Sequence, residues 1–146
     1  SYSRDTQELL SVLPYRKLRI GAYGDPAAAP TTVWRPYVLL AMGHTGYTHQ
    51  WLESFFDSDL LNYLMASVDT EEQASILSAN DTRYFRVKRD NAPSLGGEVE
   101  CLSDSAGMSC ADCLACDGGK KGKSIYINVH GSKSGNFNPD LIAVAA

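Results

Sequence analysis

The sequence lacks a long hydrophobic run, and it lacks the start of a secretory signal. No apolar stretch approaches the ~18–20 residues that a membrane-spanning helix needs. The opening "SYSRDTQELL" has neither a basic start nor an apolar core, so we expect no signal peptide and no membrane partner. Excess positive charge is also missing. The net charge of −4 argues against a nucleic-acid footprint over the whole surface, although a local basic patch remains compatible with it.

Both ends of the chain lack the features of a complete gene product. The first residue is Ser1 rather than Met, and the last residues, "LIAVAA", stop inside an apolar run. We therefore expect a processed chain or a piece of a longer protein. Its 146 residues, 44% of them hydrophobic, are enough for a single domain with its own core.

Apolar patterning predicts an α/β domain over residues 1–146. Strands are expected at 17–23, 45–51, 65–69, 82–89 and 124–131. Helices are expected at 3–14, with Ser3 or Asp5 as cap, at 31–44, with Thr31 or Thr32 as cap, at 58–64, with Ser58 as cap, and at 70–79, with Thr70 as cap. The alternation of the two kinds of element indicates a mainly parallel sheet with flanking helices.

The segment 91–123 interrupts this alternation before the last expected strand. It is rich in Gly, Ser and Asp and has few large apolar residues. A loop of this length in a compact domain needs something else to order it. All four cysteines of the chain lie in this segment.

The cysteine spacing predicts a metal site in this inserted loop. The pattern Cys101-x8-Cys110-x2-Cys113-x2-Cys116 supplies the four thiolates that Zn²⁺ or a four-iron, four-sulfur (4Fe–4S) cluster requires. The triplet with two-residue gaps favours iron–sulfur, because structural zinc more often uses two separated Cys-x2-Cys pairs. Two disulfides, ordinary buried thiols and a redox-active Cys-x-x-Cys pair are the alternatives.

A lysine cluster follows the cysteines directly. Lys120, Lys121 and Lys123 form a basic turn that could contact phosphate or nucleic acid, although a solvated turn explains it more simply. Gly122, Lys123 and Ser124 match the end of a P-loop, but Asp117 stands in place of the first glycine. A strand rather than a helix is expected to follow, so we predict no P-loop.

Polar residues are expected at the carboxyl ends of the strands, where α/β proteins bind ligands. Asp25, His49, Asp69 and His130 occupy these positions and provide candidate acid–base groups or metal ligands. Each also has a structural explanation, as a turn residue, a helix cap or a hydrogen-bonded strand residue.

Several stretches of the chain resemble a known group of proteins. "RIGAYGDPAAAP", "GYTHQW", "MASVD", "YFRV" and the cysteine-rich approach to "SIYINVHG" look like the C-terminal part of phage- and plasmid-encoded proteins of unassigned function, which are similar to radical-SAM enzymes in general plan. The resemblance implies a partial βα barrel with a centre ligated by Cys101, Cys110, Cys113 and Cys116. The Cys-x3-Cys-x2-Cys motif of radical-SAM catalysis is absent from this chain.

Three functions are compatible with these features. The first is a metal-stabilised binding or interaction module of a phage or mobile element, with a small molecule or a protein as partner. An enzyme, or part of one, with its site at the strand ends is the second, and a nucleic-acid-binding module that uses the basic turn is the third. The expected location is the cytoplasm of the host cell, with association with the virion as the alternative.

Overall fold

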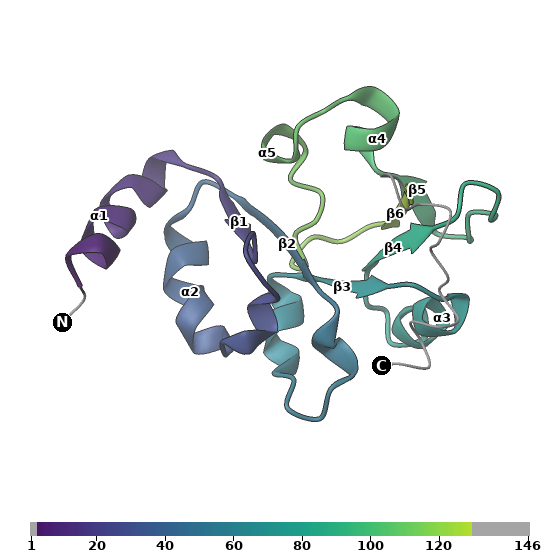
Figure 1. Ribbon diagram of the computed structural model, residues 1–146, viewed down its shortest axis with the longest axis horizontal. Coiled ribbons are helices and arrows are strands. Elements are labelled where there is room, and N and C mark those ends of the chain that lie inside the picture. Colours follow the sequence, from purple (N-terminus) through teal and green to yellow (C-terminus); the bar gives the residue numbers. More distant parts are fainter. Residues whose placement is uncertain (1–2, 130–146) are drawn as a thin grey trace.

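The computed structural model describes residues 3–129, and its centre is a parallel β-sheet (Figure 1). Its six strands are Leu18–Ile20 (β1), His44–Thr48 (β2), Met65–Val68 (β3), Tyr84–Lys88 (β4), Glu98–Glu100 (β5) and Ser124–Asn128 (β6). They lie in the order β1-β2-β3-β4-β6-β5, and every neighbouring pair is parallel. The predicted α/β class with a parallel sheet is confirmed.

Short helices connect the strands. The α-helices are Arg4–Val12 (α1), Thr31–Leu40 (α2), Glu71–Ala79 (α3), Leu102–Ala106 (α4) and Cys110–Cys113 (α5). Single turns of 3-10 helix occupy Leu13–Tyr15, Pro26–Ala28, Gln50–Leu52 and Ser58–Asn62. Within residues 3–129, no helix has the length and apolar character to cross a membrane.

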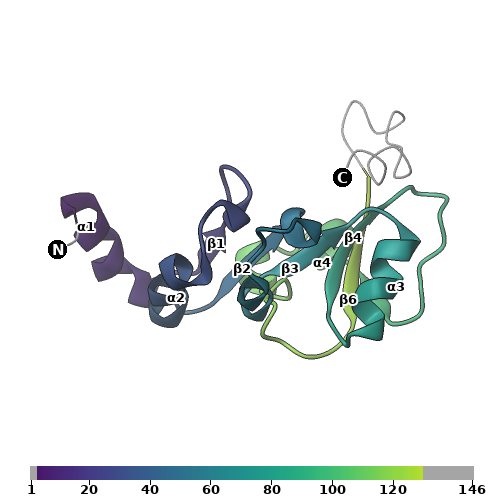
Figure 2. The ribbon, with the colours of Figure 1, turned by 90° about the horizontal axis from the view of Figure 1, so that it is seen from below.

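The strand order separates the helices from the cysteine segment. From β1 to β4 each connection steps across the sheet in one direction, whereas the connection from β5 to β6 steps back. Since crossovers between parallel strands are right-handed, these two directions place their connections on opposite faces. Accordingly, α2 and α3 lie on one face while α4 and α5 lie on the other (Figures 1 and 2).

Each face of the sheet has its own apolar core, because successive side chains of a strand point to opposite sides. On the helix face, Ala66, Val68 and Tyr84 pack with Ala74 and Leu77 of α3. The other face, which we call the cysteine face, has a buried cluster with two of the cysteines packed at its edge: Met65, Phe85, Ile125, Cys101 and Cys116. Although the cysteine segment itself has few large apolar residues, strands β3, β4 and β6 thus supply apolar neighbours to these two cysteines.

Two of the predicted helices form as expected. Ser3 caps α1 by accepting a hydrogen bond from the Thr6 N–H. Thr70 caps α3 through the Gln73 N–H. Local hydrogen bonding at the N-terminus thus decides where both helices begin.

Three element predictions need correction. Helix α2 ends at Leu40 with Pro30 as its cap, and His44 already begins β2. The predicted helix at 58–64 is a 3-10 turn, and its cap is Asp57, whose carboxylate accepts the Asp59 N–H, rather than Ser58. The segment 91–123 contains an edge strand, β5, that the Gly- and Ser-rich composition conceals.

Candidate metal centre

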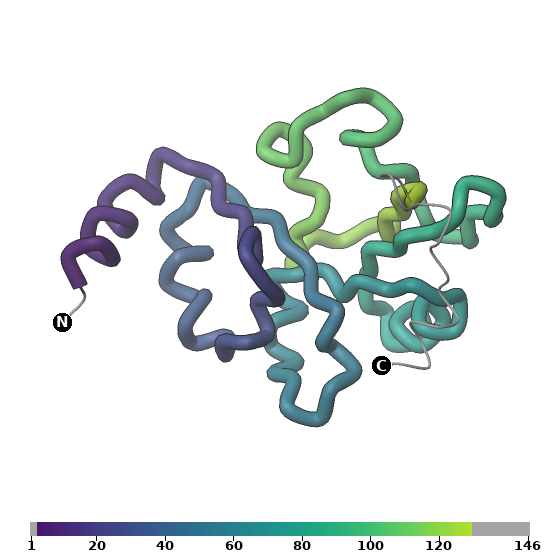
Figure 3. Tube along the Cα trace, in the orientation of Figure 1, coloured from purple at the N-terminus to yellow at the C-terminus, as the bar shows by residue number. Residues whose placement is uncertain are grey.

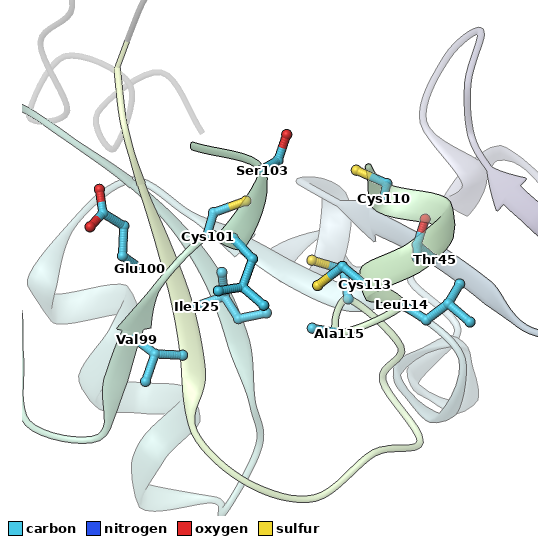
Figure 4. A pocket seen from close by; sticks show the side chains of 12 residues that line it. Thr45, Val99, Glu100, Cys101, Ser103, Cys110, Cys113, Leu114, Ala115 and Ile125 are labelled. Atoms are coloured by element: carbon cyan, nitrogen blue, oxygen red, sulfur yellow. The ribbon is translucent and has the colours of Figure 1, made fainter. Parts of the chain in front are cut away.

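The four cysteines line one hollow on the cysteine face. Its volume is about 280 Å³, and its walls are almost entirely apolar. In Figure 4 the Cys101 sulfur points across the hollow, and Cys110 and Cys113 lie on the opposite side. The lining residues are Thr45, Val99, Glu100, Cys101, Leu102, Ser103, Cys110, Cys113, Leu114, Ala115, Cys116 and Ile125. All four cysteines are free thiols, so the structure contains neither of the two disulfides considered as an alternative.

Backbone contacts to the sheet position the first and last cysteine. Cys101 follows β5 directly, and its N–H donates to the Tyr126 carbonyl of β6 at 2.8 Å. The Cys116 carbonyl accepts the Gly46 N–H of β2 at 3.0 Å. The intervening chain arches away from the sheet and returns to it (Figure 3).

The two middle cysteines are the ends of α5. Ser109 caps this turn by accepting the Asp112 N–H at 3.1 Å. The turn ends at Leu114, whose φ of 51° lies in the left-handed region and reverses the chain after Cys113. This reversal directs the chain back to Cys116.

The sulfur atoms are close enough to influence one another, but they are spread around the hollow. Burial, together with the charges of Cys101, Cys110 and Cys113, raises the pKa of the Cys116 thiol to about 12. Within residues 3–129, no three Cys, His, Asp or Glu side chains converge tightly enough to hold a single metal ion. Tetrahedral zinc with Zn–S bonds of about 2.3 Å would require the sulfurs to draw together around it.

Arg83 orders the chain between the last cysteine and β6. Its guanidinium donates hydrogen bonds to four backbone carbonyls, at distances of 2.9 to 3.2 Å. The accepting residues are Ala115, Asp117, Lys120 and Lys123. A planar guanidinium with five N–H donors suits such a set of carbonyls. The sequence pattern gave no indication of this role, because Arg83 lies at the start of a strand far from the loop.

The same loop fits closely against the 3-10 turn before β3. A Cβ atom at Gly118 would overlap the carbonyl oxygens of Leu61 and Leu64, so only glycine fits there. Nearby, His44 Nε2 lies 3.1 Å from Asp117 Oδ1 and 2.9 Å from the Tyr63 carbonyl oxygen. The "GG" in the sequence was the one signal that the backbone approaches another segment here.

A buried ion pair orders the first part of segment 91–123. Arg86 Nε lies 2.7 Å from Glu98 Oε1, and both side chains are almost fully buried. Tyr84 also donates to Glu98, as does the Leu95 N–H. Burial alone would raise the pKa of Glu98, but the hydrogen bonds from Arg86, Leu95 and Tyr84 hold it below its ordinary value. Side-chain contacts of Arg86 and Glu98 thus order the chain before Cys101, and those of Arg83 order the chain after Cys116. The stretch between these two regions begins and ends with a cysteine.

Two of the three lysines, Lys120 and Lys121, line a second, polar hollow of about 460 Å³ together with Gly118, Gly119 and Gly122. Lys120 Nζ donates to the Leu114 carbonyl at 2.7 Å, which ties the basic turn to the end of α5. Lys123 contributes its carbonyl to Arg83. Ser124 begins β6, so a strand follows the lysines and the local structure differs from a P-loop, as predicted.

Three of the predicted strand-end residues are brought together. Asp25 accepts hydrogen bonds from the Ala27 N–H, the Thr48 hydroxyl and the His49 N–H, at 2.6 to 2.9 Å. His49 Nε2 lies 2.9 Å from Ser67 Oγ and 3.8 Å from Asp69 Oδ2. His130 lies outside the described residues. Sequence reasoning missed Thr48, whose hydroxyl donates to Asp25, and Ser67, whose hydroxyl is hydrogen-bonded to His49.

The histidine at this edge is polarised by its acidic neighbour. The Asp69 carboxylate, 3.8 Å from Nε2, raises the pKa of His49 above the ordinary 6.5, and burial opposes this rise. The charges of Asp69 and Asp25 add to the increase. The His49 side chain is 53% exposed while that of Asp69 is 7% exposed, so a buried acid holds a histidine that solvent can reach. Asp25 instead serves as the cap of the turn Pro26–Ala28.

Comparison of the chain with models of protein families, with curated proteins and with solved structures finds no match. The function is therefore inferred from the geometry of these sites.

Proposed function

We propose that this chain is a metal-stabilised binding module whose four cysteines hold an iron–sulfur cluster on the cysteine face. The observation that carries the proposal is the apolar hollow of about 280 Å³ that Cys101, Cys110, Cys113 and Cys116 line together. Four thiolates form the ligand set of a 4Fe–4S cluster, and an apolar wall suits its sulfides. In line with the sequence resemblance, we propose a phage or mobile-element origin.

An iron–sulfur cluster suits this arrangement better than zinc. A single zinc ion sits directly between its sulfurs, which leaves no hollow at the centre. In a cube-shaped cluster each thiolate binds a different iron, so the ligand sulfurs stand farther apart around a volume that the cluster fills. The spread of the four thiols around a hollow fits the second case.

The proposed role of the cluster is to order the part of the chain that protein contacts hold least. Arg86 and Glu98 order the chain before Cys101, and Arg83 orders the chain after Cys116. Between them, α4 and α5 expose most of their residues and contain no buried ones. The binding free energy of four Fe–S bonds would stabilise the folded form of this segment.

The experiment compares wild-type protein with Cys116→Ser, both purified without air. We expect the wild type to contain iron and acid-labile sulfide in equal amounts, with broad visible absorbance, and Cys116→Ser to lose most of both. A Ser105→Ala variant, which alters an exposed residue of α4, is the control and should keep the wild-type iron content. If the wild type contains one zinc per chain and no sulfide, the site is a zinc site and not a cluster site. If the wild type contains no metal, the proposal is wrong.

A second candidate function is an enzyme site at the strand ends. The supporting observation is the solvent-accessible His49 imidazole beside the buried carboxylate of Asp69, an arrangement that suits a general acid or base. In a screen of small-molecule binding by NMR, ligands of this site should shift the imidazole resonances of His49 in the wild type. The same ligands should bind the Asp69→Asn variant more weakly. Ligands that bind both proteins equally would refute the site. Radical-SAM chemistry is not proposed, because its motif is absent from the sequence.

A further inference from the structure

The four cysteines differ in how firmly the fold holds them. Cys110 is exposed, whereas Cys101, Cys113 and Cys116 are partly buried. Cys101 and Cys116 pack against the buried cluster on the cysteine face. Cys110 is the first residue of α5 and lies across the hollow from Cys101 (Figure 4).

The backbone hydrogen bonds of the cysteines differ in the same way as their burial does. The N–H of Cys101 and the carbonyl of Cys116 are hydrogen-bonded to β6 and β2. The Cys110 carbonyl accepts the Leu114 N–H, a bond within the same turn. Loss of a ligand at Cys110 thus disturbs neither sheet contact, whereas loss at Cys116 removes a side chain from the core.

We infer that the iron beside Cys110 is an exchangeable corner of the cluster, open to a small anionic sulfur or oxygen ligand from solution. This inference rests on the proposed function. Three thiolates then retain the cluster, and the fourth coordination position faces the solvent. An iron with such a position can bind a ligand, a capacity that a cluster with four buried thiolates lacks.

An exchangeable iron beside Cys110 would be lost when the cluster is oxidised. A one-electron oxidant such as ferricyanide would convert the cluster from 4Fe–4S(2+) to 3Fe–4S(1+), and one Fe²⁺ would leave. The electron passes to ferricyanide, which becomes ferrocyanide, and the Cys110 thiolate is freed. Adding Fe²⁺ and a reductant reverses both changes.

The experiment uses Cys110→Ala and Cys116→Ala of the full chain, purified without air beside the wild type. We expect Cys110→Ala to keep about three irons per chain and, after ferricyanide, to give the electron paramagnetic resonance signal of a three-iron cluster. Adding Fe²⁺ with 2-mercaptoethanol should restore a fourth iron, because the small thiol can occupy the open position. Cys116→Ala should lose the cluster and gain none back with the thiol.

The outcomes separate the inference from the proposed function. If the wild type holds a cluster but Cys110→Ala loses iron as completely as Cys116→Ala, the inference is wrong and the proposed function stands. Equal rescue of both variants by 2-mercaptoethanol would also overturn it. If the wild type itself binds no iron, the proposed function fails and the inference with it. Far-UV circular dichroism establishes whether each variant is folded.

Discussion

Single residues decide how closely the cysteine segment approaches the sheet. Gly118 allows the loop after Cys116 to lie directly on the carbonyls of Leu61 and Leu64. A side chain there has no room unless the backbone moves. The close contact at Gly118 therefore fixes the distance between the loop after Cys116 and the 3-10 turn Ser58–Asn62.

We predict that Gly118→Ala lowers the free energy of unfolding by about 1–3 kcal/mol, because the added methyl group overpacks the contact. It should also reduce the bound metal, since Cys116 lies two residues away. Gly96→Ala is the matched control, because a Cβ at Gly96 meets nothing within 4 Å. Urea denaturation of both variants gives the comparison, and equal stability of the two would contradict the role of Gly118.

At the strand ends, Asp25 and His49 are expected to respond differently to replacement. Asp25→Ala removes three hydrogen bonds and leaves the fully buried Thr48 hydroxyl without its acceptor, so we predict a loss of about 2–3 kcal/mol. His49→Gln should cost little at neutral pH, since the imidazole is half exposed. A large loss of stability in His49→Gln would indicate a structural histidine instead.

The raised pKa of His49 also gives a pH dependence. The folded protein favours protonated His49, so its contribution to stability is fully present below the unfolded pKa of 6.5. This contribution disappears as the pH rises through the higher folded pKa. The stability difference between wild type and His49→Gln should therefore shrink between acidic and mildly alkaline pH, and this change with pH should be smaller in an Asp69→Asn background, where only Asp25 still favours the protonated form. A difference that grows with pH would contradict this assignment.

At the scale of elements, local signals were sufficient for most helices and strands. Ser3 and Thr70 mark two helix starts, and apolar patterning located β1, β2, β3, β4 and β6. β5 was missed because its sequence, Glu-Val-Glu, carries little apolar signal. Its first residue is buried only because Arg86, twelve residues earlier, supplies the opposite charge. Such a pairing cannot be read from local composition.

The buried pair can be tested by its replacement. We predict that Arg86→Met lowers the free energy of unfolding by about 3–5 kcal/mol, because it leaves the Glu98 charge buried without its cation. Arg86→Met with Glu98→Leu should recover much of this loss, since no unpaired charge remains. Thermal denaturation of the two variants decides the question. A double variant that is less stable than Arg86→Met alone would contradict the explanation.

At the scale of the whole molecule, the sheet order determines what the cysteines face. The backward step from β5 to β6 sends the cysteine segment to the side opposite α2 and α3. The spacing of the cysteines predicted a common site, and the structure places all four around one hollow. The buried cluster against which Cys101 and Cys116 pack could not be predicted, because Met65 and Phe85 come from strands far away in the sequence. The hydrogen bonds from Arg83 to the loop carbonyls could not be predicted either, because Arg83 lies more than thirty residues before the loop in the sequence.

We propose that four thiolates around this hollow hold an iron–sulfur cluster. Native mass spectrometry of the full chain, purified without air, measures whether that cluster is bound. We predict a single main species with the mass of the chain plus four irons and four sulfides, and the plain chain mass after acid treatment. The mass of the unmodified chain under native conditions, or that mass reduced by the hydrogens lost in two disulfides, would contradict the claim.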